Sequence, residues 1–396
     1  MTFFSKEGLI VFVDRKEQTI GKNCPFAEND VSLHSIKNNL HPIFMNSQDV
    51  IICRNLQKDL TEALNLQSYD KLFILTDENT SKHCLPLLLT ALGNVKNHLI
   101  TIPSSDLYKN VETLAYVWNE LSNHEGSRHS LMINLGGGMV TDLGGFAAST
   151  FKRGIRYINI PTTLLAMVDA AVGGKTGINF NGLKNEVGIF NPASVVLIET
   201  DFLRTLDQRN LVSGYSEMLK HGLISTTSHW VELLQFNPGS PDYVFLKDLV
   251  GESVQVKERI VKEDPYEHGI RKALNFGHTV GHAFESLSFE QNTPVLHGYA
   301  VAWGMICELY LSAVLTCFPQ DKMRQTIHFI RENWGCYPIN CEQYEHLYGL
   351  MTHDKKNRDG IINFTLLRDI GDIAINQTAD RKMIYEMFDF YRESCE

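Results

Sequence analysis

Three histidines within one short stretch of the sequence have the spacing of a metal site. His278 and His282 are four residues apart, so a helix would place them on one face, and His297 follows after a short polar break. Neutral imidazole is a common zinc ligand, and catalytic zinc usually takes three protein ligands and leaves one position open. Glu217 is the candidate carboxylate ligand, because Lys220 and His221 follow it on the same helical face. Histidines four apart also occur in cores and on surfaces, so spacing alone leaves both interpretations open.

Two other segments have residues suited to phosphate or ribose. Gly136–Gly138, with Asp142 beyond it, follows a predicted strand and opens a predicted helix, where free backbone N–H groups favour an anion; a tight structural turn is the alternative. Asp77 and Asn79 follow another strand and could hold a ribose, although a helix-capping turn explains them equally well. Gly173–Thr176 resembles the end of a nucleotide-binding P-loop, but Asp169 stands where that motif needs glycine, so no nucleoside-triphosphate site is expected.

Several cations lie beside glycines or close to these motifs. Any one of them could be an ordinary surface charge. If they converge, they suit an anionic substrate with a phosphate, a carboxylate or both. Together with a nucleotide cradle and a metal, they indicate redox or elimination chemistry on a phosphorylated acid. These residues are Arg153, Lys175, Lys184, Lys220, Lys257 and Arg271.

The predicted secondary structure that positions these residues changes near residue 200, from alternating strands and helices to helices. Short apolar runs alternate with helix-length segments in the first half, which predicts a parallel sheet covered by helices. The predicted strands are 49–53, 71–75, 98–102, 130–135, 157–160 and 195–198. Beyond Thr205 the apolar residues recur every three or four positions, which predicts a helical half. We therefore expect two domains, 1–200 and 201–396, with residues 1–45 as an extension or an extra hairpin.

Composition narrows the class of protein. The 396 residues carry 36 Lys+Arg against 46 Asp+Glu, a formal charge of −10 without a long single-sign block, which argues against nucleic acid as a main partner. The apolar stretch Val301–Phe318 is interrupted by Glu308, so we expect a buried helix and no membrane span. Eight cysteines form no Cys-x-x-Cys pair, and we expect reduced thiols in a cytoplasmic enzyme.

After about residue 45 the chain resembles the 3-dehydroquinate synthase family over nearly its whole length. A dozen ordered motifs carry the resemblance: Gly136–Gly138 with Asp142, Arg153–Gly154, Pro161–Asp169, Val172–Asn179, Lys184–Asn185, Glu217–Lys220, Lys257, Glu267, Arg271, Leu274–His282, His297–Gly298 and Asp354–Lys356. The resemblance implies a Rossmann-like NAD-binding α/β domain with a parallel sheet, followed by an all-α metal-binding domain, in a homodimer. It also implies zinc or cobalt as the metal.

The implied reaction is the second step of the shikimate pathway. A phosphorylated keto acid, 3-deoxy-D-arabino-heptulosonate 7-phosphate, would give 3-dehydroquinate and phosphate by transient oxidation with NAD, phosphate elimination, re-reduction and aldol closure. The two acidic groups Asp77 and Asp106 would favour NAD over NADP by repelling a 2′-phosphate. Asp106 also stands where the family usually has glutamate, so its carboxylate is one methylene shorter at the position that would contact the ribose.

The resemblance assigns roles residue by residue. The metal ligands match Glu217, His278 and His297, whereas His282 faces the substrate, unlike the pair that spacing suggests. The nucleotide residues match Asp77, Asn79, Asp106, Lys109, Gly137, Gly138, Met139, Asp142, Thr162, Thr163, Lys184, Asn185, Phe202 and Thr205. The substrate residues match Arg153, Asp169, Lys175, Lys184, Lys220, Lys257, Arg271, Asn275, His282 and Lys356, with Lys355 as an alternative to Lys356.

Two other classes share part of this pattern. Sugar-phosphate cyclases whose substrates lack a carboxylate and metal-dependent alcohol dehydrogenases have the same fold. They are disfavoured because Arg271 and Asn275 are both present, and a neutral sugar would leave the Arg271 charge unpaired. A binding protein without turnover is the third possibility. The intact set of Glu217, His278 and His297 argues against it.

Overall fold

The computed structural model describes residues 5–6, 9–10, 48–352 and 361–395. Contacts group residues 46–396 into one compact unit and 1–45 into another. In the latter, the two-residue strands β1 (Ser5–Lys6) and β2 (Leu9–Ile10) pair antiparallel.

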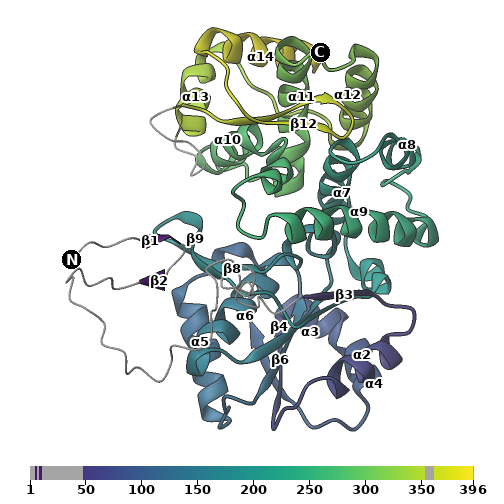
Figure 1. Cartoon of the computed structure of the whole chain (residues 1–396), viewed down its shortest axis with the longest axis vertical. Coiled ribbons are helices and arrows are strands. Elements are labelled where there is room, and N and C mark those ends of the chain that lie inside the picture. Colours follow the sequence, from purple (N-terminus) through teal and green to yellow (C-terminus); the bar gives the residue numbers. More distant parts are fainter. Residues whose placement is uncertain (1–4, 7–8, 11–47, 353–360, 396) are drawn as a thin grey trace, which may run out of the picture. The chain divides into compact units, whose positions relative to one another are not determined.

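A six-stranded sheet forms the first half of the larger unit (Figure 1). Its order is β3-β10-β7-β6-β4-β5 and every pairing is parallel. The strands are β3 (Asp49–Ile52), β4 (Leu72–Asp77), β5 (His98–Ile102), β6 (Leu131–Gly136), β7 (Arg156–Pro161) and β10 (Val195–Ile198). All six strands predicted from the sequence are confirmed. The most central strands, such as β6, are buried along their whole length, because helices cover both faces.

Helices flank this sheet on both sides in Figure 1. α2 and α4 pack together on one side, and α5 and α6 pack together on the other. The bounds of this set are α2 (Leu56–Asn65), α3 (Glu78–His83), α4 (Leu85–Leu92), α5 (Val111–Asn123) and α6 (Gly138–Thr150). A two-stranded antiparallel hairpin, β8 (Lys175–Phe180) and β9 (Leu183–Phe190), packs on α6 and was not predicted. A P-loop leads from a strand through a glycine-rich loop into a helix. Lys175 begins a strand and not a helix, so this segment is not a P-loop.

The second half is helical. Its helices are α7 (Gln208–Leu223), α8 (Thr227–Gln235), α9 (Tyr243–Glu263), α10 (His278–Glu290), α11 (His297–Leu315), α12 (Gln320–Trp334), α13 (Tyr344–Thr352) and α14 (Arg381–Ser394). One hairpin, β11 (Phe364–Asp369) and β12 (Asp372–Gln377), packs on α11 and η5 (Ile270–Asn275), so this half is not purely helical. Figure 1 shows α7 and α9 between the sheet and the other helices, and both contact the short helix η3 (Ala166–Ala170).

The structure tests two expectations that were based on composition. Among the described residues, α11 is long and apolar enough to cross a bilayer, but 72% of the tested stretch is buried inside the protein, as expected for a core helix. The expectation that the thiols are reduced is wrong for one pair, because Cys336 and Cys395 form a disulfide. Helix packing brings together residues 59 positions apart, a contact that cysteine spacing does not predict.

Candidate active site

The predicted metal ligands come from three helices that meet closely. His278 and His297 are the first residues of α10 and α11, and Glu217 lies in the middle of α7. Gly298 permits the approach of α11 to α7, because a Cβ at that position would lie 1.8 Å from the Ser213 carbonyl oxygen. Since Ser213 is one turn before Glu217, this contact brings His297 over the carboxylate.

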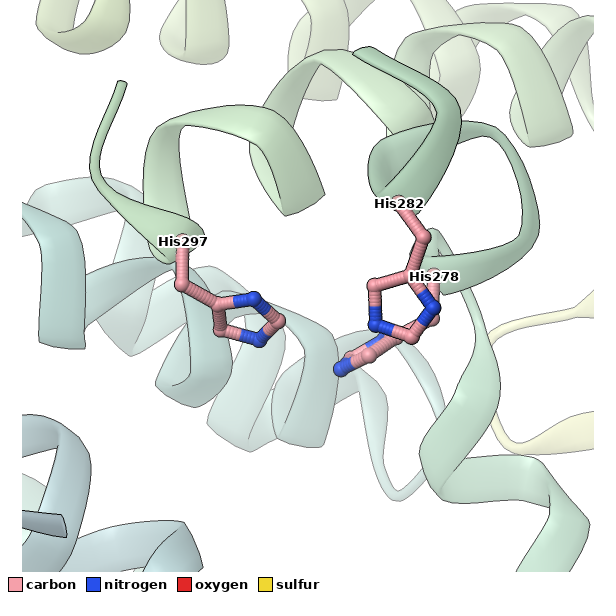
Figure 2. A group of neighbouring side chains, drawn as sticks. All are labelled: His278, His282 and His297. Carbon is pink, nitrogen blue, oxygen red and sulfur yellow. The ribbon is translucent and has the colours of Figure 1, made fainter. Parts of the chain in front are cut away.

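The geometry of these groups fits a divalent cation. Glu217 Oε1 lies 3.4 Å from His278 Nε2 and 3.5 Å from His297 Nε2. Ligand atoms about 2.0–2.1 Å from a tetrahedral zinc ion would be about 3.4 Å apart. Glu217 Oε1 is fully buried and makes no hydrogen bond, so it is free to act as a ligand. His282 completes a cluster in which nitrogen atoms of the three histidines lie within 4.8 Å of one another (Figure 2). Distance alone therefore does not exclude His282 as a ligand.

Two buried lysine–carboxylate pairs adjoin the metal ligands. Lys220 contacts Glu217 one turn away on α7, and Lys257 Nζ on α9 lies 2.5 Å from Asp169 Oδ1. Burial would raise the pKa of Glu217, but Lys220 and the neighbouring imidazoles hold it well below its usual range. Burial lowers the pKa of Lys257 to about 8, against the opposing effect of Asp169. The predicted substrate residues Asp169, Lys220 and Lys257 thus form one charged cluster beside the metal ligands.

Glu285 joins the metal ligands to the hairpin of the first half. One carboxylate oxygen of this buried residue lies 3.5 Å from His297 Nδ1, and the other accepts a 2.8 Å hydrogen bond from Lys184 Nζ on β9. A carboxylate on the second ring nitrogen is the usual way to orient a metal-ligating histidine. Sequence reasoning missed Glu285, although it follows His278 by seven residues and shares its helical face.

Three further substrate candidates meet around Glu267. Its carboxylate contacts Lys175 and accepts a 2.6 Å hydrogen bond from Asn275 Nδ2. Arg271, only 2% exposed, donates from Nη2 to the Gly173 carbonyl at 3.1 Å, and its Nε is buried without a partner. The guanidinium therefore bridges the two halves of the unit and keeps one unsatisfied donor.

The nucleotide candidates lie where parallel strands end. Asp77 ends β4, Asp106 follows β5, Gly137 and Gly138 follow β6, and the pair Thr162–Thr163 follows β7. Ligands of open α/β sheets bind outside the carboxyl ends of strands, where strand order reverses. Here that reversal falls between β4 and β6, because β5 lies beyond β4 and the chain then returns to β6.

The glycine-rich segment has the predicted form. Gly137 is the residue before α6, and Gly138 and Met139 begin that helix. A Cβ at Gly137 would lie 3.0 Å from Thr163 Cγ2, so glycine keeps the backbone close to the end of β7. Free N–H groups of the first helical turn are therefore presented at the carboxyl edge of the sheet, as an anion requires.

A buried lysine ties several nucleotide candidates together. Lys109 Nζ lies 3.0 Å from Asp142 Oδ2 and 3.7 Å from Asp106 Oδ1, and it donates to Asn185 Oδ1 at 2.5 Å. Burial would lower the pKa of Lys109, but the two aspartates raise it above its ordinary value. Lys184, next to Asn185, also lies 3.9 Å from Asp106, so the hairpin contacts this network twice.

The remaining nucleotide candidates have structural contacts as well. Asp77 Oδ1 accepts hydrogen bonds from Asn79 N at 2.8 Å and Thr80 N at 2.9 Å, so it caps α3 as the structural interpretation expected. Phe202 is fully buried, and its carbonyl accepts a 2.7 Å hydrogen bond from Thr205 Oγ1 after β10.

The structure does not bring the predicted substrate residue Arg153 into these clusters. Arg153 is exposed just after α6, and it makes no hydrogen bond or ion pair with any residue in the described part of the chain. Lys355 and Lys356 lie outside the described residues. His221, which sequence analysis treated only as a marker of the helical face, is fully buried beside Lys220, and burial lowers its pKa to about 3.

Comparisons with known proteins agree with this arrangement. Models of the 3-dehydroquinate synthase N-terminal and C-terminal regions match residues 99–213 and 214–357. A 3-dehydroquinate synthase of Parabacteroides distasonis is 56% identical over 350 residues, covering 88% of this chain and 99% of that protein.

Two solved structures are also similar. A 2-epi-5-epi-valiolone synthase of Streptomyces hygroscopicus with NAD+ and Zn2+ bound has a TM-score of 0.78 at 27% identity, covering 88% of this chain and 97% of its own. A 2-deoxy-scyllo-inosose synthase complexed with carbaglucose-6-phosphate, NAD+ and Co2+ has a TM-score of 0.75 at 22% identity, with 87% and 96% covered, and shows likeness of fold.

Proposed function

This chain belongs to the 3-dehydroquinate synthase family, and on that premise we propose that it converts 3-deoxy-D-arabino-heptulosonate 7-phosphate into 3-dehydroquinate and phosphate. The enzyme is a phosphorus–oxygen lyase of the shikimate pathway, which leads to aromatic amino acids. We infer that it acts as a cytoplasmic homodimer. Residues 1–200 form its NAD-binding domain, and residues 201–396 form its metal- and substrate-binding domain.

The observation that carries the proposal is the buried, unsatisfied Glu217 Oε1 between His278 and His297. A buried carboxylate oxygen without a hydrogen-bond partner is costly in a protein interior, so this site favours a cation beside Oε1. One carboxylate and two imidazoles suit zinc or cobalt and leave positions for substrate oxygens.

Two bound groups complete the site. The metal is held by the three ligands above, and NAD by the strand ends with Asp77, Asp106, Gly137 and Gly138. When bound, NAD supplies transient hydride acceptance and the metal supplies Lewis-acid polarisation of substrate oxygens.

The residues of this chain bind and orient the anionic substrate. Lys175 and Asn275, joined through Glu267, present donors to the phosphate. Arg271 holds the carboxylate, because its unpartnered Nε–H and the second N–H of Nη2 lie on one edge of the planar guanidinium and can donate to the two carboxylate oxygens. The cations keep the departing phosphate in place, and its oxygen is positioned to accept the proton from the neighbouring carbon as the carbon–oxygen bond breaks.

The proton-handling residues are Lys257, Lys220 and His282. Lys257, with a pKa lowered to about 8 by burial, can give up or accept a proton near neutral pH, whereas Lys220 stays charged beside Glu217. His282 lies beside His278 and faces the same space, so it can donate a hydrogen bond to a substrate oxygen (Figure 2).

A test follows phosphate and dehydroquinate together. Purified protein is mixed with the heptulosonate phosphate, Co2+ and NAD at a small fraction of the substrate concentration. We expect many turnovers, equal amounts of phosphate and dehydroquinate, and no accumulation of NADH, because the same hydride returns to the substrate. The Glu217→Gln variant is the inactive control. NADH formed in proportion to product would indicate an alcohol dehydrogenase, and preference for a sugar phosphate without a carboxylate would indicate another cyclase.

A further inference from the structure

A second buried carboxylate, Glu308, contacts the backbone around one metal ligand. Glu308 lies on α11 and is fully buried. Its Oε2 accepts a 2.7 Å hydrogen bond from Gly277 N, and its Oε1 accepts from Thr279 N at 3.1 Å and Val280 N at 3.4 Å. The N–H groups of a first helical turn have no partner within their helix, and a carboxylate there is also favoured by the helix dipole. Glu308 therefore holds the start of α10 from a neighbouring helix.

These hydrogen bonds lie on both sides of His278. Gly277 precedes this histidine and Thr279 follows it, so Glu308 fixes backbone N–H groups on both sides of the ligand. The ring is tied to the same segment, because His278 Nδ1 lies 3.1 Å from the Phe276 carbonyl oxygen. A carbonyl only accepts, so Nδ1 carries the proton of this hydrogen bond, and Nε2 is the ring nitrogen directed at Glu217 Oε1.

The close crossing of α10 and α11 makes this contact possible. A Cβ at Gly304 would lie 2.0 Å from the Gly277 carbonyl oxygen and 2.6 Å from Gly281 N. Only glycine fits at this crossing, four residues before Glu308. Because α11 also begins with His297, one helix carries a metal ligand and the carboxylate that fixes the backbone of another ligand.

We propose that Glu308 is a positioning residue for the metal site. It acts through the backbone of α10 to keep His278 Nε2 directed at Glu217, and it does not touch the substrate. This inference rests on the proposed function in one respect, namely that His278 is a metal ligand. It predicts that a charged, fully buried residue in an apolar helix controls metal affinity from outside the ligand set.

The test measures metal binding in the full-length protein without turnover. Glu308→Gln preserves size, but it removes the charge and directs an NH2 group at backbone donors. We expect its Kd for Co2+, from chelator competition, to rise about tenfold or more, as for other outer-shell partners of metal ligands. The visible Co2+ spectrum should also change, while NAD binding stays as in the parent protein. Excess Co2+ should restore much of the lost rate.

Two comparisons separate positioning from general destabilisation. Cys307→Ala leaves a cavity in the same buried helix but keeps the carboxylate, and it should bind Co2+ with the parent Kd and spectrum. If Glu308→Gln does not fold, Glu308→Asp is used, whose shorter carboxylate reaches fewer of the N–H groups and should weaken Co2+ binding by a smaller factor. If the folded Glu308→Gln or Glu308→Asp protein binds Co2+ with the Kd and spectrum of the parent protein, the proposal is overturned. Retention of Co2+ by His278→Ala overturns the ligand set and this inference with it, whereas loss of Co2+ there with normal binding in Glu308→Gln overturns only the role of Glu308.

Discussion

Replacement of two histidines one turn apart tests the ligand assignment most directly. His278 and His282 lie on the same face of α10, with ring centroids 5.4 Å apart. His278 Nε2 lies 3.4 Å from Glu217 Oε1, close to the spacing of two ligands of one metal ion. We therefore expect His278→Ala to lose the metal and turnover together. His282→Ala should keep the metal and lose rate, because it removes a group that faces the substrate.

The expected size of the effect follows from the ligand count. Structural zinc sites with four protein ligands bind with about 10–16 kcal/mol, or roughly 3 kcal/mol for each ligand. Loss of one ligand should therefore raise the Kd of His278→Ala about 100-fold, since 1.4 kcal/mol is about tenfold. A substrate-facing residue outside the ligand set should change the Kd by less than about tenfold, the lower limit for outer-shell partners.

The assay is metal content after equilibration with a chelator, paired with Co2+ titration followed by visible absorption. His328→Ala is the matched control, because that side chain is 75% exposed on α12 and should leave both measurements unchanged. Stoichiometric loss of metal from both His278→Ala and His282→Ala would restore the pair that spacing alone suggests, and retention of metal by His278→Ala would refute the assignment of His278.

Three further outcomes are expected. NADP should support activity at least about 30-fold below NAD, because Asp77 and Asp106 would meet its 2′-phosphate at a cost of roughly 2 kcal/mol, and equal activation in a cofactor titration would contradict this. Arg271→Lys should lower kcat/KM about tenfold, or ~1.5 kcal/mol, since a lysine cannot donate to both carboxylate oxygens; unchanged steady-state kinetics would show that Arg271 has another role. Burial lowers the pKa of Lys257 to about 8, so the cation paired with Asp169 is lost as pH rises through 8, and kcat/KM should fall there. In Lys257→Arg that decline should disappear from the pH profile, and a decline at the same pH in both proteins would exclude Lys257 as its source.

The sequence predicted the sheet because its strands are apolar and its connections are helical. Runs such as Leu131–Gly136 are buried on both faces, so composition alone marks them as strands. The hairpin of β8 and β9 escaped prediction for a different reason. Every residue of β9 is exposed, and β8 begins with Lys175 directly after two glycines, so neither strand has a continuous apolar run. Such strands depend on their pairing with each other and on their contact with α6.

The sequence indicated which residues belong to the site, but not which other residues each of them contacts. The histidine spacing indicated a metal site at the start of α10, but it could not separate His278 from His282 as the ligand, since both share one helical face. The role of Glu285 depends on Lys184, which lies 101 residues earlier, and on His297 at the start of another helix. Contacts of this kind arise from packing between elements, which periodicity does not describe.

The arrangement of charges gives the two buried lysines different tasks. Lys220 and Lys257 are both almost fully buried, and burial alone would lower the pKa of each. Glu217 and Asp169 together raise the pKa of Lys220 above its ordinary value, so it remains a fixed cation beside the metal ligands. The pKa of Lys257 stays near 8, because it is paired with Asp169 alone and is further lowered by the charges of Lys220 and Arg271. A group with a pKa near the working pH exchanges protons most effectively, so we propose Lys257, and not Lys220, for proton transfer.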